Sequence, residues 1–138
     1  MTTTTKPRQL FVNIAVRDLE RSKAFFAKLG FSFNPKFTDD KAACMIVGSD
    51  AFVMLLSEPF FKTFTKKTLA DAADSTQALY AFSAESREEV DRLVKIAIES
   101  GGSQSMPPQD HGFMYGWSFC DPDGHQFEVI WMDPKAAE

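Results

Sequence analysis

The stretch from residue 121 to residue 131 places an acidic side chain where chemistry is possible. Pro122 and Gly124 are residue types that favour a tight turn, and the residues after them alternate in the manner of a β-strand. In that strand Glu128 shares a face with Gln126 and lies among apolar neighbours. A desolvated carboxyl group has a raised pKa unless a donor compensates it. Glu128 is therefore a candidate general base, or an anchor for a cationic or hydroxylated ligand.

A structural role for Glu128 is equally open, as a carboxylate bonded to Tyr80 or to a backbone amide. The two histidines of the chain, His111 and His125, lie on either side of the 121–124 turn in the sequence. His111, in a loop with two glycines, could pair with Asp110 as a base, although an exposed loop residue is the simpler interpretation. His125 is interpreted as a solvent-side strand residue. Asp121 and Asp123 are interpreted as turn formers rather than ligands.

Composition excludes several classes of function. The net charge is −4 and the isoelectric point is near 5.2, which argues against a nucleic-acid partner. No apolar run approaches the length of a membrane span, so we expect no membrane partner. Cys44 and Cys120 each lie in an apolar run and are expected to be buried thiols, which suits a cytoplasmic location. Fourteen phenylalanines suggest a core or cavity lined with aromatic rings.

Hydrophobic periodicity predicts the same order of elements twice. A strand at 10–16 precedes a helix at 19–29 that begins after Asp18, and three strands follow. After a long connection, a strand at 77–84 precedes a helix that begins with a capping box from Ser86 to Glu89. The remaining strands are expected at 31–33, 42–47, 51–57, 103–106, 115–120 and 126–131.

This repeat predicts a single domain covering residues 1–138. Its first βαβββ module covers about 9–58, the connection about 59–76, and the second module about 77–133. A ferredoxin-like sandwich would need the order βαββαβ and would leave the extra hairpin strands unexplained. Three phenylalanines in the connection could form a lid, a dimer contact or a small satellite core: Phe60, Phe61 and Phe64.

The Asp-Pro-Asp-Gly turn, the Glu in the following strand and the tandem modules together resemble the vicinal oxygen chelate superfamily. That group holds glyoxalase, extradiol dioxygenases, fosfomycin-resistance enzymes and bleomycin-resistance proteins. The resemblance implies an α+β fold in which two tandem βαβββ modules form a cup-shaped curved sheet with helices outside. It also implies a homodimer.

Catalytic members of that superfamily hold a divalent metal with four side chains, and the resemblance places those positions at Phe11, Leu55, Ala78 and Glu128. Only Glu128 can donate a lone pair to a metal. We therefore predict no metal cofactor at the usual position of the family. Alternation predicts instead a small-molecule pocket, whose inward-facing residues would be Phe11, Asn13, Val53, Leu55, Tyr80, Phe82, Gln126 and Glu128.

The sequence thus predicts a protein that binds a small molecule in an aromatic cup around Glu128 without the family metal. Three hypotheses follow from that prediction. One is sequestration of a cationic drug, as in bleomycin-resistance proteins. A second is an isomerase or lyase that uses Glu128 as its base. The third is a metal-dependent lyase or dioxygenase in which His111 or His125 joins Glu128 as a relocated ligand.

Overall fold

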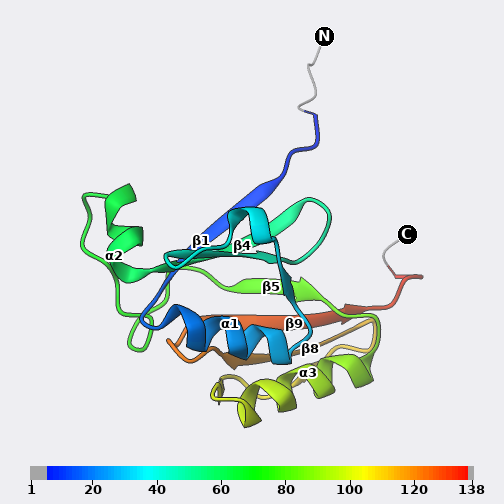
Figure 1. Ribbon diagram of the computed structural model, residues 1–138. Helices are drawn as coiled ribbons and strands as arrows, with labels where there is room; N and C mark the ends of the chain where they lie inside the picture. The colour runs from blue at the N-terminus through cyan, green and yellow to red at the C-terminus, as the bar shows by residue number, and fades with distance from the viewer. Residues whose placement is uncertain (1–5, 137–138) are drawn as a thin grey trace. The chain divides into compact units, whose positions relative to one another are not determined.

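A computed structural model describes residues 6–136, which form two compact units. The first unit contains the described residues up to 19 and residues 31–66; the second contains residues 20–30 and the described residues from 67 onward (Figure 1). Each unit is built on its own β-sheet. The predicted α+β class with two βαβββ-like sheets is confirmed.

The first sheet has the strand order β1-β4-β3-β2. Strand β1 runs parallel to β4, whereas β3 is antiparallel to both β4 and β2. The segment after β4 turns into two short helical pieces that the sequence did not predict. The elements of this unit are β1 (Leu10–Val16), β2 (Ser32–Phe33), η1 (Pro35–Phe37), β3 (Ala42–Ile46), β4 (Ala51–Ser57), α2 (Glu58–Phe61) and η2 (Lys62–Phe64).

The second sheet repeats this plan with the strand order β5-β9-β8-β6, and a further short strand, β7, also pairs with β8. Its first and last strands, β5 and β9, are again parallel neighbours. Strand β5 is shorter than the predicted strand at 77–84, and β7 was not predicted. The elements are α1 (Leu19–Lys28), β5 (Tyr80–Ser83), α3 (Arg87–Glu99), β6 (Ser103–Gln104), β7 (Gln109–Asp110), β8 (Met114–Cys120) and β9 (Gln126–Met132).

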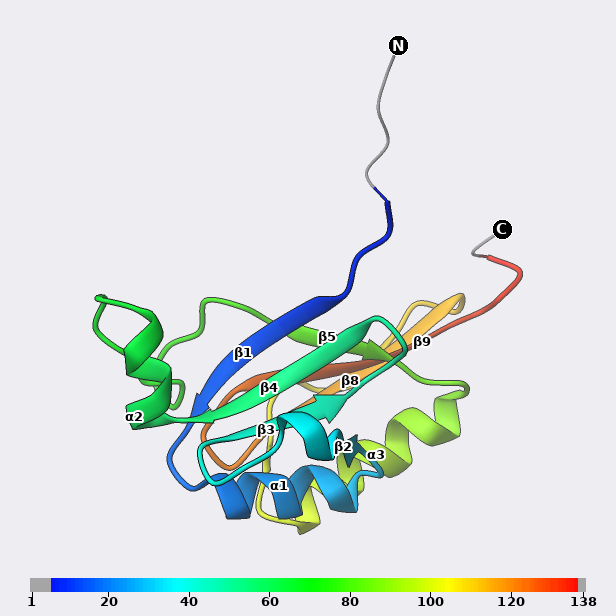
Figure 2. The ribbon, with the colours of Figure 1, turned by 45° about the horizontal axis from the view of Figure 1, so that its top comes forward.

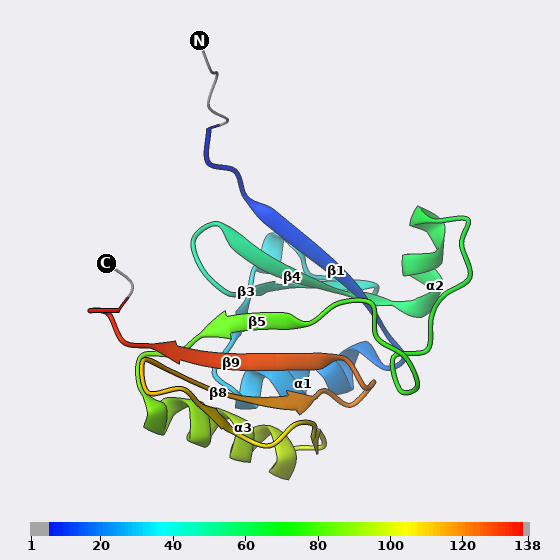
Figure 3. The same cartoon turned by 180° about the vertical axis from the view of Figure 1, so that it is seen from behind.

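Helices α1 and α3 cover one face of the second sheet (Figures 1 and 3). The ring of Phe26 on α1 lies 5.2 Å from that of Phe127 on β9, and the ring of Phe25 lies 5.9 Å from that of Phe119 on β8. All four rings are buried, and each contributes about 1.5–3 kcal/mol of hydrophobic stabilisation. Helix α1 therefore packs in the second unit, although the sequence assigned it to the first module.

Helix α3 begins with the predicted capping box. The hydroxyl of Ser86 accepts a hydrogen bond of 3.0 Å from the backbone N–H of Glu89, while the Glu89 carboxylate accepts one of 3.0 Å from the N–H of Glu85. Its predicted apolar residues Val90, Leu93, Val94 and Ala97 are buried. Local chemistry thus defines this helix, and its apolar stripe directs it onto β8 and β9.

Candidate functional site

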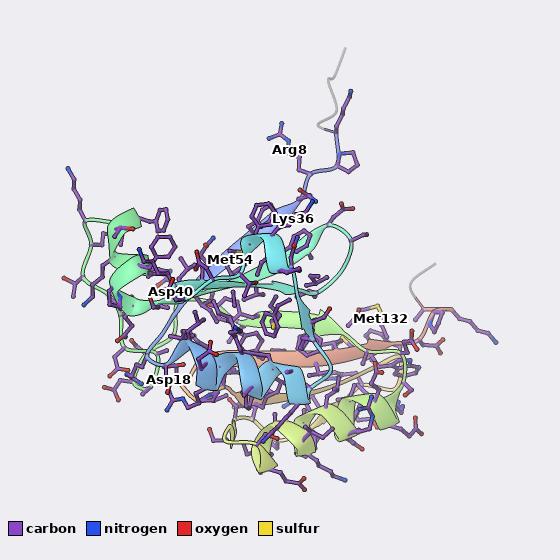
Figure 4. All side chains as sticks on the ribbon, viewed as in Figure 1. Arg8, Asp18, Lys36, Asp40, Met54 and Met132 are labelled. Carbon is purple, nitrogen blue, oxygen red and sulfur yellow. The ribbon has the colours of Figure 1, made fainter. Side chains whose placement is uncertain are left out.

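Glu128 lies on the face of the second sheet that α1 and α3 leave uncovered. Its neighbours across the strands are Ala81 on β5 and Ser118 on β8. Side chains alternate along β9, so Phe127 and Val129 face the helices while Glu128 faces away from them. We call this the Glu128 face. On β8 and β9 it also carries Met114, Gly116, Cys120, Gln126, Ile130 and Met132, the last of which is visible in Figure 4.

A hydrogen bond joins the two polar side chains predicted from alternation. The amide nitrogen Nε2 of Gln126 donates to Oε2 of Glu128 over 2.9 Å, and both residues are half-buried. This bond directs the amide N–H group toward the carboxylate. The pair then offers several acceptor sites, on the carboxylate and on the amide oxygen of Gln126, and one donor, the second N–H of the amide.

The residues beside Glu128 are small, and the end of the face at Met114 and Met132 is apolar. Ala81, Gly116 and Ser118 flank it, and the Ser118 hydroxyl accepts a hydrogen bond of 3.0 Å from the backbone N–H of Met106. Met132 is 45% exposed at the far end of β9. The arrangement is a carboxylate with an apolar surround, which is the composition of a small-molecule site.

The prediction that Tyr80 and Phe82 share a face with Glu128 is wrong. Strand β5 pairs with β9 so that Tyr80 lies beside Phe127 and Phe82 beside Val129, both on the helix-covered face. The Tyr80 and Phe127 rings are 5.2 Å apart. Burial raises the pKa of Tyr80, and the negative charge of Asp121 raises it further. Tyr80 is therefore half-buried on the helix-covered face and does not lie beside Glu128.

The first unit requires a similar correction. Phe11 and Asn13 lie on one face of the first sheet, where the Phe11 ring stacks on Phe52 at 4.9 Å. Leu55 pairs with Ile14, so it lies on the opposite face with Val53 and is fully buried. The predicted set of Phe11, Asn13, Val53 and Leu55 is therefore divided between two faces. The β4 residues that share the face of Phe11 are Phe52, Met54 and Leu56, and Met54 is labelled in Figure 4.

The residues at the positions that the resemblance assigns to metal ligands do not fit a transition metal. On β5 the neighbour of Glu128 is Ala81 rather than Ala78, and neither alanine is a ligand. Beside Phe11, the register places Phe52, and the next residue on that face of β4 is Met54. None of these residues has an imidazole or a carboxylate group. Transition metals bind to several imidazole or carboxylate groups, and Glu128 supplies only one.

Among residues 6–136, one group of three potential ligands lies within 4.8 Å: Asp121, Asp123 and His125. These residues build the turn before β9. Asp121 accepts hydrogen bonds from the backbone N–H groups of Asp123, at 3.1 Å, and His125, at 2.7 Å. Its other carboxylate oxygen lies 2.9 Å from Nδ1 of His125. Asp123 accepts a bond of 3.4 Å from the hydroxyl of Ser22 on α1.

Donors from the turn occupy the Asp121 carboxylate, as its predicted turn-forming role requires. Asp123 lies in the same turn, but its carboxylate is bound by Ser22 and Arg21 of α1. The prediction for His125 is wrong: its side chain is only 11% exposed and is bound to Asp121. Sequence reasoning missed this contact, although an Asp four residues before a His across a turn was a usable signal. His125 does not join Glu128 as a ligand.

His111 lies on an exposed loop, as the simpler interpretation predicted. Asp110 does not pair with it as a base would require. The Asp110 carboxylate accepts a bond of 2.7 Å from Arg87 and one of 2.9 Å from the N–H of Gly112. The Arg87 guanidinium also holds the pKa of Asp110 below its usual value.

Arg87 anchors the 109–113 segment to the start of α3, an arrangement that sequence reasoning missed. The guanidinium donates to the Gly112 carbonyl over 2.8 Å and lies 5.3 Å from the centre of the Tyr115 ring. It lies 5.1 Å from the centre of the Trp131 ring as well. Tyr115 in turn donates a hydrogen bond of 2.6 Å to Asp91. Three sequentially distant segments meet here, so no local pattern could have revealed the contact.

Comparison with known proteins identifies a family and several similar folds. Residues 8–129 match the family described as "Glyoxalase/Bleomycin resistance protein/Dioxygenase superfamily". Comparison with curated protein sequences finds no significant match.

Several solved structures are similar over nearly the whole chain. A hypothetical protein, SA1046 from S. aureus, is 28% identical, with a TM-score of 0.77 and coverage of 94% of this chain and 95% of that one. A glyoxalase-related enzyme from Fulvimarina pelagi is 16% identical, with a TM-score of 0.77 and coverage of 92% and 88%. The fosfomycin resistance protein FosX from Mesorhizobium loti is 17% identical, with a TM-score of 0.68 and coverage of 97% and 98%. At such identities the last two likenesses concern the fold alone.

Proposed function

Since this chain belongs to the glyoxalase/bleomycin resistance protein/dioxygenase superfamily, we propose that it binds a small molecule on the Glu128 face without the family metal. The observation that carries the proposal is the bond of 2.9 Å from Gln126 to Glu128 amid small and apolar neighbours. Fold alone does not select a function within a superfamily, so the chemistry of these side chains must do so.

The chemistry of this pair favours a ligand that donates hydrogen bonds. One of the two N–H groups of the Gln126 amide is engaged by the carboxylate, so the acceptor sites that remain outnumber the one remaining donor. A cationic or hydroxylated head group would satisfy them, and the apolar surround, which includes Ile130 and Met132, suits an apolar body. Sequestration of a cationic drug, as in bleomycin-resistance proteins, meets both requirements. We propose it ahead of catalysis.

Two enzymatic alternatives use the same residues. Glu128 could act as a base on a carbonyl compound in an isomerase or lyase. A metal-dependent lyase or dioxygenase would need ligands beyond Glu128, and His125 is bound to Asp121 instead. The binding proposal requires neither a proton transfer nor an additional ligand, and the acceptor pair supports it directly.

We further propose that the protein is a cytoplasmic homodimer. Strands β1 and β5 are edge strands of their sheets, and exposed edges tend to pair with another chain unless they are covered. Cys44 and Cys120 are free thiols, which suits a reducing compartment. No helix in the described part of the chain is long and apolar enough to cross a membrane.

The experiment that tests the binding proposal is a thermal-shift screen of amines, guanidinium compounds and polyols, followed by calorimetry on the hits. Loss of one charge-assisted hydrogen bond in Glu128→Gln should weaken binding by about 1.5–3 kcal/mol. The matched control is Glu20→Gln, which removes an exposed carboxylate from α1. Equal affinity in wild type and Glu128→Gln would reject the site.

Elemental analysis of protein purified without tag or chelator tests the metal part of the proposal. We expect no stoichiometric transition metal and no thermal stabilisation on adding nickel, zinc, manganese or iron, since a bound metal would stabilise the fold by mass action. One equivalent of tightly bound metal that Glu128→Gln releases would return the protein to the metal-dependent enzymes.

A further inference from the structure

The segment from Glu58 to Phe64 leaves the first sheet at the end of β4 as a short helical projection (Figure 2). Pro59 lies in its first turn, and the backbone N–H of Lys62 donates to the carbonyls of Glu58 and Phe60. The Thr63 hydroxyl donates to the Phe60 carbonyl over 2.7 Å. These bonds give the projection a defined conformation despite its length. We call residues 58–67 the Phe64 projection.

An aromatic ring stands exposed on this projection. Phe64 is 69% exposed, the largest exposed fraction among the exposed large hydrophobic side chains of the described residues. Its ring packs edge-on against that of Phe60, with 5.1 Å between the centroids. The contact fixes the ring in an outward position. A single exposed ring is not an interaction site by itself, so the side chains around it decide what it can bind.

Lysines flank Phe64 in the sequence. The projection carries Lys62, Lys66 and Lys67 but only one acidic residue, Glu58, in a chain whose net charge is −4. All three lysines are exposed. Within residues 6–136, neither Lys62 nor Lys66 forms an ion pair. The projection is therefore a locally cationic and aromatic surface on an acidic protein.

We infer that the Phe64 projection docks on an anionic membrane surface. An aromatic ring at the headgroup level combined with lysines that reach the lipid phosphates is how peripheral proteins bind bilayers. A lipid surface favours this projection over a peptide partner, because a single projecting ring offers no groove for a peptide, whereas lipids rearrange around it. The expectation of no membrane partner rested on the lack of a spanning segment, which peripheral docking does not need. The inference is independent of ligand binding on the Glu128 face.

The test is flotation of the full-length protein with vesicles of phosphatidylcholine, with and without phosphatidylserine. We expect the wild type to float only with the anionic vesicles, and high salt should release it. The double substitution Lys62→Gln and Lys66→Gln should weaken partitioning by roughly 30-fold, at about fivefold for each lysine. Phe64→Ser should weaken it through loss of the inserted ring.

A matched control comes from the same unit. Phe37 on η1 is 62% exposed and follows the exposed Lys36, which is labelled in Figure 4. Phe37→Ser and Lys36→Gln should leave flotation unchanged. Failure of the wild type to float, equal flotation on uncharged vesicles, or equal losses in the control variants would overturn the inference. The inference would also be overturned if Phe64→Ser changed the oligomeric state, measured by sedimentation, but not flotation. The Phe64 projection would then mediate self-association.

Discussion

At the scale of single residues, Gly124 shows how the turn before β9 is fixed by backbone conformation. Its φ of +101° lies in the region that favours glycine, and a Cβ atom there would be only 2.8 Å from the carbonyl oxygen of Ala72. Gly124→Ala would therefore combine backbone strain with a contact against rigid backbone. We expect a loss of about 2–3 kcal/mol in the free energy of unfolding, measured by denaturant titration.

Gly48 supplies the control for that measurement. It also lies in a turn between strands, but an added Cβ atom would meet nothing within 4 Å. Gly48→Ala should change the free energy of unfolding by less than about 1 kcal/mol. Equal denaturant midpoints for the two variants would show that the turn at Gly124 relaxes freely.

Single residues also explain which site predictions succeeded. Alternation placed Glu128 and Gln126 on the same face correctly, because both belong to one strand. The same reasoning failed for Tyr80 and Leu55, because their faces depend on how β5 and β4 pair with other strands. In β4 both faces are apolar, so its sequence contains no signal that distinguishes one face from the other.

At the scale of elements, the sequence predicted the parts whose causes are local. The capping box of α3 and the turn at residues 121–124 depend on neighbouring residues. The two-residue strand β7 and the short α2 and η2 pieces were missed, because so few residues carry no periodicity. The association of α1 with the second sheet was also missed, since Phe25 and Phe26 would suit any apolar partner.

The anchoring of the 109–113 segment by Arg87 leads to a prediction about local opening. Arg87→Met removes the hydrogen bonds to Asp110 and Gly112 while keeping an unbranched apolar chain beside Tyr115. We expect the amide of Gly112, which donates to Asp110, to exchange hydrogen faster. Amides in the buried turns of α3 should be unaffected.

Two comparisons make that prediction specific. Arg92→Met removes another exposed arginine of α3, one that contacts Glu89 at 3.5 Å, and should leave the Gly112 amide unchanged. Acid provides the second comparison. Because Arg87 lowers the pKa of Asp110 below its ordinary 3.8, the protection should be complete above that pH and lost as the pH falls through the lowered pKa. Identical exchange in wild type and Arg87→Met would contradict the anchoring role.

At the scale of the whole molecule, the family resemblance accounts for the fold and leaves the chemistry to individual side chains. Structures 16–28% identical to this chain share its architecture over most of its length. Two of the positions that the resemblance assigns to metal ligands, Phe11 and Ala78, nevertheless hold residues that cannot replace a histidine. The backbone plan thus persists while the residues on its faces change, so a function must be argued from those faces.

The alkaline limit of the folded state is a further property of the whole chain, because its only two tyrosines, Tyr80 and Tyr115, both have raised pKa values. Burial and the hydrogen bond to Asp91 raise the pKa of Tyr115 to about 12, against an ordinary value of 10. Since folding holds both phenols in the protonated form, their contribution to stability is complete below pH 10. It is lost as the pH rises from 10 through the raised values.

Absorbance at 295 nm, which reports tyrosinate, tests this directly. The native protein should show less tyrosinate at pH 10 than the protein unfolded in urea, which should be half ionised there. In Tyr80→Phe the only tyrosine transition that remains is that of Tyr115. Adding Asp91→Asn should move this transition to lower pH, because the carboxylate charge is removed. Circular dichroism at each pH separates ionisation from unfolding. A native transition centred at pH 10 would contradict the prediction. It would mean that both phenols are open to water, without the hydrogen bond from Tyr115 to Asp91 and the packing of Tyr80 on Phe127.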